Sequence, residues 1–154
     1  MAFTNSLLCI GLDPHEKELF PSGTVVPEND EAKADAAFTF CKTLIDATLP
    51  YAACYKPNAA FFEALGPEGI KALERICKNE IPSDVPILLD VKRGDIGSTA
   101  VAYAKAAFDH CGADAVTLSP LMGWDSVSPF VTGKTMNIKT VILTRVHKPF
   151  QSST

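Results

Sequence analysis

Residues 85–99 of the chain read VPILLDVKRGDIGST, and this stretch decides the fold. It begins with an apolar run, VPILL, which has the length and composition of a buried strand. The run ends in a dense polar block and helical spacing returns at once, with Ser98 or Thr99 as the expected helix cap and Gly112 just past the helix end. A buried strand followed directly by a helix is the repeating unit of a parallel α/β sheet.

The same pattern recurs on both sides of this stretch. Short apolar runs predict strands at residues 7–12, 51–55, 85–89, 113–118 and 140–144. Helical spacing predicts helices between Asn29 and Pro50, between Ala59 and Pro82 with a break at Gly66-Pro67, from about Ser98 to Gly112, and from Asp125 to Val131. The order is strand and helix four times, followed by a fifth strand.

Two architectures fit this order, an open doubly wound sheet and part of a (β/α)8 barrel of the TIM type. The open sheet usually carries a glycine-rich phosphate loop after a strand, and neither G-x-G-x-x-G nor G-x4-G-K-[ST] occurs. We therefore predict an α/β fold of the (β/α)8 type, of which the chain holds about the first five strands and four helices.

The composition is that of one globular domain, which we place at residues 1–154. Apolar residues make up 47% and charged residues 21%, with a net charge of −4. No apolar run is long enough to span a membrane, and the first residues lack the basic start of a secretory signal, so we expect a cytoplasmic protein. The acidic balance argues against nucleic acid, and the histidines lack zinc-site spacing. The five cysteines include no C-x-x-C pair and are expected to be reduced, most of them packed inside.

Polar residues gather where the predicted strands end, which is the edge that holds the ligand in α/β proteins. In chain order they are Asp13, Lys56, Asp90 with Lys92, and Ser119. Asp90 and Lys92 are two residues apart, so their side chains leave an extended strand on the same face. A lysine beside a carboxylate stays protonated and can stabilise developing negative charge and then donate a proton. The structural alternative is an exposed ion pair, and Asp95 could serve only as a carboxylate at a helix N-terminus.

Three motifs in order resemble the orotidine 5′-phosphate decarboxylase family. They are LCIGLDP at residues 8–14, YKPN at residues 55–58 with Phe61-Phe62, and LDVKRGDIGST at residues 89–99. The Asp-x-Lys-x-x-Asp-Ile core is the signature of the wider superfamily, and the resemblance extends over roughly residues 6–133.

The resemblance implies decarboxylation of orotidine 5′-phosphate to uridine monophosphate (UMP) in pyrimidine biosynthesis, without a cofactor or a metal. It implies a catalytic network of alternating charge made of Lys56, Asp90, Lys92 and Asp95. Within it, Lys92 stabilises and protonates the carbanion-like state at C6, and Asp90 lies beside the substrate carboxylate. The residues that it implies for substrate binding are Asp13 and Lys56 at the ribose, with Ile96, Thr99, Ser119 and Pro120.

The resemblance also implies partners. The active unit would be a homodimer in which Asp95 and Thr99 reach into the neighbouring subunit's site. An orotate phosphoribosyltransferase, fused or associated, is a possible second partner.

The family barrel continues through three further strands whose loops grip the phosphate, whereas this chain stops at Thr154. We therefore expect a C-terminally truncated barrel with impaired activity. Two alternatives remain at this point. One is a magnesium-dependent sugar-phosphate aldolase or decarboxylase of the same superfamily, although Lys56 stands where those enzymes carry an acidic metal ligand. The other is an inactive fragment that needs a complementing half or a partner domain.

Overall fold

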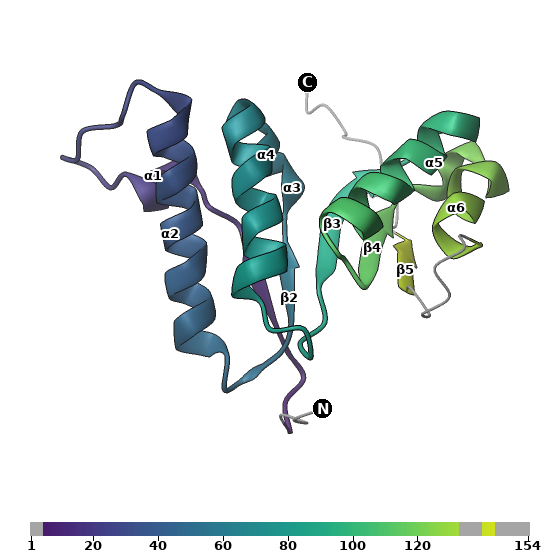
Figure 1. Cartoon of the computed structure of the whole chain (residues 1–154), viewed down its shortest axis with the longest axis horizontal. Helices are drawn as coiled ribbons and strands as arrows, with labels where there is room; N and C mark the ends of the chain where they lie inside the picture. Colours follow the sequence, from purple (N-terminus) through teal and green to yellow (C-terminus); the bar gives the residue numbers. More distant parts are fainter. Residues whose placement is uncertain (1–4, 133–139, 144–154) are drawn as a thin grey trace, which may run out of the picture.

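The computed structural model describes residues 5–132 and 140–143, and its five strands are all parallel to their neighbours (Figure 1). The strands are β1 Leu8–Leu12, β2 Ala52–Pro57, β3 Leu88–Arg93, β4 Ala115–Leu118 and β5 Thr140–Leu143. β1 pairs with β2, and β4 pairs with both β3 and β5. Isolated parallel bridges from Tyr55 to Ile87 and from Asn58 to Asp90 connect β2 to β3. The spatial order of the strands therefore follows their order in the sequence.

This sequential order distinguishes between the two candidate architectures. In a doubly wound sheet the strand order reverses and helices cover both faces. Here each strand lies beside the next one along the chain, and in the view of Figure 1 α4 and α5 lie in front of the strands, with α2 to the left of α4. Sequential parallel strands with helices outside are the arrangement of a (β/α)8 barrel. The predicted barrel-type fold is confirmed for five strands, with Thr144 outside the described residues.

The helices follow the predicted segments closely. They are α1 Glu16–Leu19, α2 Asp30–Thr48, α3 Ala59–Glu63, α4 Gly66–Arg75 with a π-helical end η1 Ile76–Glu80, α5 Gly97–Lys105 with a π-helical end η2 Ala106–His110, the 3-10 turn η3 Pro120–Met122, and α6 Trp124–Val131. Asn29 caps α2 through its Oδ1, which accepts from Ala32 N at 2.7 Å. The short helix α1 is an element that the spacing did not predict.

The predicted start of the helix after β3 is wrong. Neither Ser98 nor Thr99 is the cap, because α5 begins at Gly97 and Ile96 precedes it without a side-chain hydrogen bond. Gly97 has a φ of 55°, a left-handed conformation that glycine adopts without a steric penalty, so the chain turns into the helix earlier than the hydroxyl pattern indicates. At the other end, Gly112 has a φ of 68°, as expected for a residue just past a helix.

The core lies between the strands and the outer helices. Tyr55 of β2 is fully buried, and its hydroxyl donates to the Ile45 carbonyl oxygen of α2 at 3.1 Å. All five cysteines are free, and Cys41 and Cys77 are buried as expected. Cys54 and Cys111 are partly buried, and Cys9 is exposed. Within the described part of the chain, no helix is long and apolar enough to cross a membrane.

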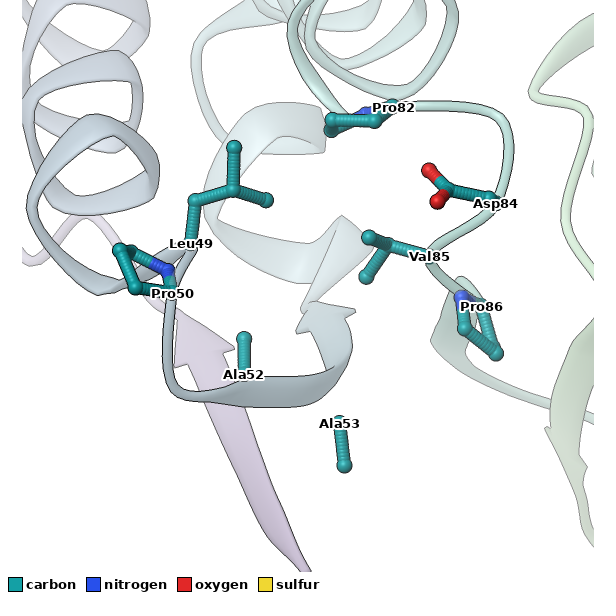
Figure 2. Close-up of a pocket in the computed structure, with 8 residues that line it drawn as sticks. All are labelled: Leu49, Pro50, Ala52, Ala53, Pro82, Asp84, Val85 and Pro86. Atoms are coloured by element: carbon teal, nitrogen blue, oxygen red, sulfur yellow. The ribbon is translucent and has the colours of Figure 1, made fainter. Parts of the chain in front are cut away.

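A pocket of about 290 Å³ lies beside the segments that lead into β2 and β3 (Figure 2). We call it the proline pocket, and its lining residues are Leu49, Pro50, Ala52, Ala53, Pro82, Asp84, Val85 and Pro86. The lining is mostly apolar, with Asp84 as the single ionisable side chain. The pocket lies at the amino-terminal ends of the strands, which in barrel enzymes is the face opposite the active site.

Candidate active site

Three charged side chains meet at the carboxyl-terminal ends of β2 and β3. Lys56 Nζ lies 2.5 Å from Asp90 Oδ2, and Lys92 Nζ lies 2.6 Å from Asp90 Oδ1. We call this group the Lys56–Asp90–Lys92 cluster. The Asp90 side chain is only 4% exposed, whereas those of Lys56 and Lys92 are 32% and 57% exposed. A buried carboxylate thus has one ammonium group on each of its oxygens.

The strand register brings these residues together. Lys56 of β2 lies opposite Gly11 of β1, and Asn58 just after β2 forms a bridge with Asp90 of β3. Parallel strands deliver their carboxyl ends to one edge, so residues 34 positions apart become neighbours there. The sequence-based expectation that Lys56, Asp90 and Lys92 share one site agrees with this geometry.

The cluster holds Asp90 ionised. Burial by itself raises the pKa of the Asp90 carboxyl, but hydrogen bonds from Lys56, Lys92 and Thr117 outweigh burial and lower that pKa from 3.8 to about 2. The carboxylate therefore keeps its negative charge at neutral pH, where it attracts and positions both ammonium groups. Buried charge is costly unless it is paired in this way, and such perturbed groups concentrate at functional sites.

Lys92 has an unusual backbone. Its φ is 45°, and it is the only non-glycine residue with a positive φ among those that the structure describes. A side chain in this region is disfavoured because its Cβ crowds the carbonyl oxygen, and such strain persists only where the surroundings enforce it. The strained residue carries the ammonium group that faces the open side of the cluster.

Thr117 of β4 is a member of the site that the sequence analysis missed. It is 4% exposed, and its hydroxyl donates to Asp90 Oδ1 at 2.7 Å. The Thr117 hydroxyl oxygen also accepts hydrogen bonds from the backbone N–H of Val91 at 3.1 Å and of Lys92 at 3.0 Å. Its sequence signal was weak, because a threonine in an apolar run reads as an ordinary strand residue. Its position in the middle of β4 rather than after the strand also concealed it.

Arg93 is a second residue without a predicted role. Its guanidinium pairs with Glu63 of α3 and lies 4.9 Å from the ring centroid of Tyr103 of α5. These contacts connect the end of β3 to a helix on either side of it. Arg93 therefore faces the helices and stabilises the scaffold beneath the cluster, whereas Lys92 faces the site.

Asp13 and Ser119 follow β1 and β4, at the carboxyl-terminal ends of these strands. Asp13 follows β1, and a Cβ placed on Gly11 would lie 2.6 Å from Asp13 Oδ2, so the carboxylate folds back over the glycine. The Ser119 N–H donates to the Arg93 carbonyl oxygen at 2.7 Å. A Cβ on Gly94 would lie 2.8 Å from the Ser119 carbonyl oxygen, which explains the glycine in this turn. Pro120 begins η3 directly afterwards.

Asp95 lies apart from the cluster within one chain. Its Oδ1 accepts from the Ile96 N–H at 2.8 Å, and it has no ion pair with any residue that the structure describes. Ile96 is 50% exposed and Thr99 is also exposed, at the start of α5. This placement is compatible with their predicted contribution across a subunit interface, which stays a prediction.

The arrangement can stabilise an anion. Lys92 presents its ammonium group on the exposed side of the cluster, where charge developing on a bound molecule would meet it. The same group can then transfer its proton.

Comparison with known proteins identifies the family of the chain. Residues 6–149 match the orotidine 5′-phosphate decarboxylase / HUMPS family. The chain belongs to this family. It is 52% identical over 126 residues to the orotidine 5′-phosphate decarboxylase of Herpetosiphon aurantiacus, which covers 82% of this chain and 44% of that protein.

Solved structures of the family have the same fold. A candidate orotidine monophosphate decarboxylase from Toxoplasma gondii superposes with a TM-score of 0.78 at 52% identity, over 91% of this chain and 44% of the other. UMP synthase from Leishmania donovani gives a TM-score of 0.74 at 46% identity, over 90% of this chain and 27% of the other. The chain thus spans less than half the length of these family members.

Proposed function

We propose that this chain carries the catalytic charges for decarboxylation of orotidine 5′-phosphate to UMP in pyrimidine biosynthesis. The observation that carries the proposal is the buried Asp90 carboxylate with Lys56 and Lys92 on its two oxygens, at 2.5 and 2.6 Å. The family and its decarboxylase members support the choice of substrate.

Lys92 performs the chemical step in this proposal. The bond between C6 of the pyrimidine and its carboxylate breaks, carbon dioxide leaves, and the electron pair remains on C6. The Lys92 ammonium stabilises that charge and transfers a proton from Nζ to C6, so that neutral lysine and UMP result. Solvent then returns the proton to Lys92. Asp90 holds both ammonium groups in place beside the substrate carboxylate, and Lys56 with Asp13 contacts the ribose. Ile96, Thr99, Ser119 and Pro120 complete the proposed substrate contacts.

The magnesium-dependent alternative is not favoured. A magnesium ion requires carboxylate oxygens, and both oxygens of Asp90 already accept hydrogen bonds from ammonium groups. Lys56 and Lys92 would repel a divalent cation placed between them. We therefore assign no metal or cofactor to the proposed reaction.

The direct test is turnover by the purified chain. Orotidine 5′-phosphate is added, its absorbance is followed, and UMP is identified by chromatography. UMP formation that persists in excess EDTA supports the proposal. Turnover that requires added magnesium would favour the alternative, and absence of UMP at high protein concentration would contradict the proposal for this chain.

We further propose that the active unit is a homodimer. Asp95 and Thr99 would reach the partner's site from the start of α5. Large apolar side chains are exposed on α5 and on the adjoining η3 and α6, as expected for an interface. They are Ile96, Val101, Leu121, Met122 and Trp124.

Subunit mixing tests this shared site. Lys92→Ala and Asp95→Asn variants should each be inactive, yet a mixture should regain activity, because every heterodimer has one site with both native residues and half of the randomly exchanged dimers are heterodimers. Random exchange predicts about a quarter of wild-type activity at equal amounts. A mixture that stays inactive although sedimentation shows dimers would contradict the assignment of Asp95.

We also propose a second partner for the chain. A fused or associated orotate phosphoribosyltransferase would supply the substrate, and the likeness to a quarter of a longer UMP synthase chain supports it, with 27% of that chain covered. Co-purification with a tagged chain tests the association.

The five free cysteines fit a reducing compartment, so we propose that the chain lies in the cytoplasm. Imaging of a fluorescent fusion tests this location.

A further inference from the structure

The ladder between β3 and β4 is interrupted at the cluster. Leu89 pairs with Val116, and the next pair along the strands is Arg93 with Leu118. Residues 90–92 of β3 therefore lie opposite Thr117 alone. Such an irregularity leaves backbone amides without their regular strand partners, and it redirects the side chains that it carries.

The Thr117 hydroxyl provides hydrogen bonds for the amides that the interrupted ladder leaves without strand partners. It accepts from the N–H groups of Val91 and Lys92, and it donates its own proton to Asp90 Oδ1. A hydroxyl has one donor and two acceptor positions, and here all three are used. Its orientation is therefore completely determined, and Thr117 is buried away from competing water.

The hydroxyl acts on two catalytic groups at once. It binds the same oxygen of Asp90 that pairs with Lys92 Nζ, and it holds the Lys92 amide in the segment where Lys92 has its left-handed φ of 45°. Because the strained conformation requires enforcement by its surroundings, the two amide contacts explain why it persists.

We infer that Thr117 is a positioning residue for the reaction, because its single hydroxyl sets both the orientation of the Asp90 carboxylate and the backbone turn that presents Lys92. It acts through these two residues. The effect on turnover rests on the proposed function, whereas the effect on Asp90 and Lys92 does not.

The test compares two substitutions at Thr117 with one matched control. Thr117→Val keeps the shape and removes the hydroxyl, and Thr117→Ser keeps the hydroxyl and removes a methyl group. Thr48→Val is the matched control. The Thr48 hydroxyl donates to the Leu44 carbonyl oxygen at 2.7 Å and lies 3.0 Å from Tyr55 Oη, and it makes no contact with the cluster among these bonds.

Turnover should fall roughly 10- to 100-fold in Thr117→Val, mainly in kcat, because Lys92 moves relative to the substrate. Thr117→Ser should recover most of the wild-type kcat, and Thr48→Val should leave kcat unchanged. Wild-type kcat in Thr117→Val, or a Thr117→Ser variant as slow as Thr117→Val, would overturn the inference.

Two further readouts do not depend on turnover. NMR titration should show that the pKa of the Asp90 carboxyl rises in Thr117→Val and returns in Thr117→Ser. In the wild-type protein, the Val91 and Lys92 amides should exchange with solvent as slowly as amides of the strand ladders. Fast exchange there would overturn the inference even if Thr117→Val failed to fold. If the wild-type chain makes no UMP, the proposed function fails, while titration and exchange still decide the role of Thr117.

Discussion

The two ends of the strands differ sharply in chemistry. At the carboxyl ends, Asp90 is buried with two lysines on its oxygens. At the amino ends, the proline pocket is lined by apolar side chains, and its one carboxylate, Asp84, is exposed (Figure 2). The same residue type, aspartate, is therefore buried, paired and ionised at one end and solvated at the other.

This difference shows how the molecule divides its tasks. Prolines at the amino ends restrict the backbone where the chain enters β2 and β3, which is a contribution to the fold. The carboxyl ends hold charge out of water and a strained backbone at Lys92, both of which cost stability unless they serve a purpose. The proline pocket has a mostly apolar lining with one exposed carboxylate, whereas the carboxyl ends bring together one buried carboxylate and two ammonium groups.

Removing the Lys92 amine should produce the largest effect. Lys92→Ala should lower the rate of UMP formation by at least about 10³-fold, because both charge stabilisation and proton donation are lost. Unfolding free energy should change by only about 1 kcal/mol, since the ammonium is half exposed and Lys56 still pairs with Asp90.

Lys71→Ala is the matched control, because Lys71 forms an exposed pair with Glu68 on α4. It should keep wild-type turnover. Substantial turnover in Lys92→Ala, measured with the same assay, would remove Lys92 from its assigned role.

Neutralising Asp90 should produce the second-largest loss of turnover. Asp90→Asn should slow UMP formation roughly 100-fold, because an amide cannot hold two ammonium groups as a carboxylate does. It should also lower the free energy of unfolding at pH 7 by about 2 kcal/mol, the amount that corresponds to a pKa lowered from 3.8 to about 2. Urea unfolding and steady-state kinetics measure the two effects. A variant as stable and as fast as wild type would contradict the paired, ionised state of Asp90.

The pH dependence of the free energy of unfolding tests the contribution of the Asp90 carboxylate separately. Since the folded pKa of Asp90 lies below its unfolded value, its contribution is fully present above about pH 4 and is lost as the pH falls toward about 2. Wild type should therefore lose about 2 kcal/mol more than Asp90→Asn over this interval, measured as the difference in urea unfolding. Parallel curves for the two proteins would show that Asp90 is not the group responsible.

The smallest effect should come from the other end of the strands. Asp84→Asn is the same substitution as Asp90→Asn, but Asp84 is exposed in the proline pocket. It should change the free energy of unfolding by less than about 0.5 kcal/mol and leave turnover unaltered. A loss of activity comparable to that of Asp90→Asn would mean that the two ends are not functionally distinct.

Local patterns in the sequence determined most of the secondary structure. Apolar runs ending in polar blocks indicated all five strands, although β3 extends over Leu88–Arg93 rather than residues 85–89, and Asn29 correctly marked the start of α2. Spacing predicted that Asp90 and Lys92 share one face of an extended strand. Their side chains do pair, but Lys92 has a left-handed φ of 45° rather than an extended backbone. The start of α5 was misplaced, since a left-handed Gly97 can begin the helix without a hydroxyl cap.

The tertiary structure decided what lies between strands. Sequential strand order selected the barrel over the doubly wound sheet, and order in space cannot be obtained from periodicity within each strand. The pairing of Lys56 with Asp90 and the contacts of Thr117 join residues that are 34 and 27 positions apart. The motifs indicated the charged residues of the cluster, but only the interrupted ladder between β3 and β4 revealed the hydroxyl that contacts them, because that hydrogen bonding depends on register across strands.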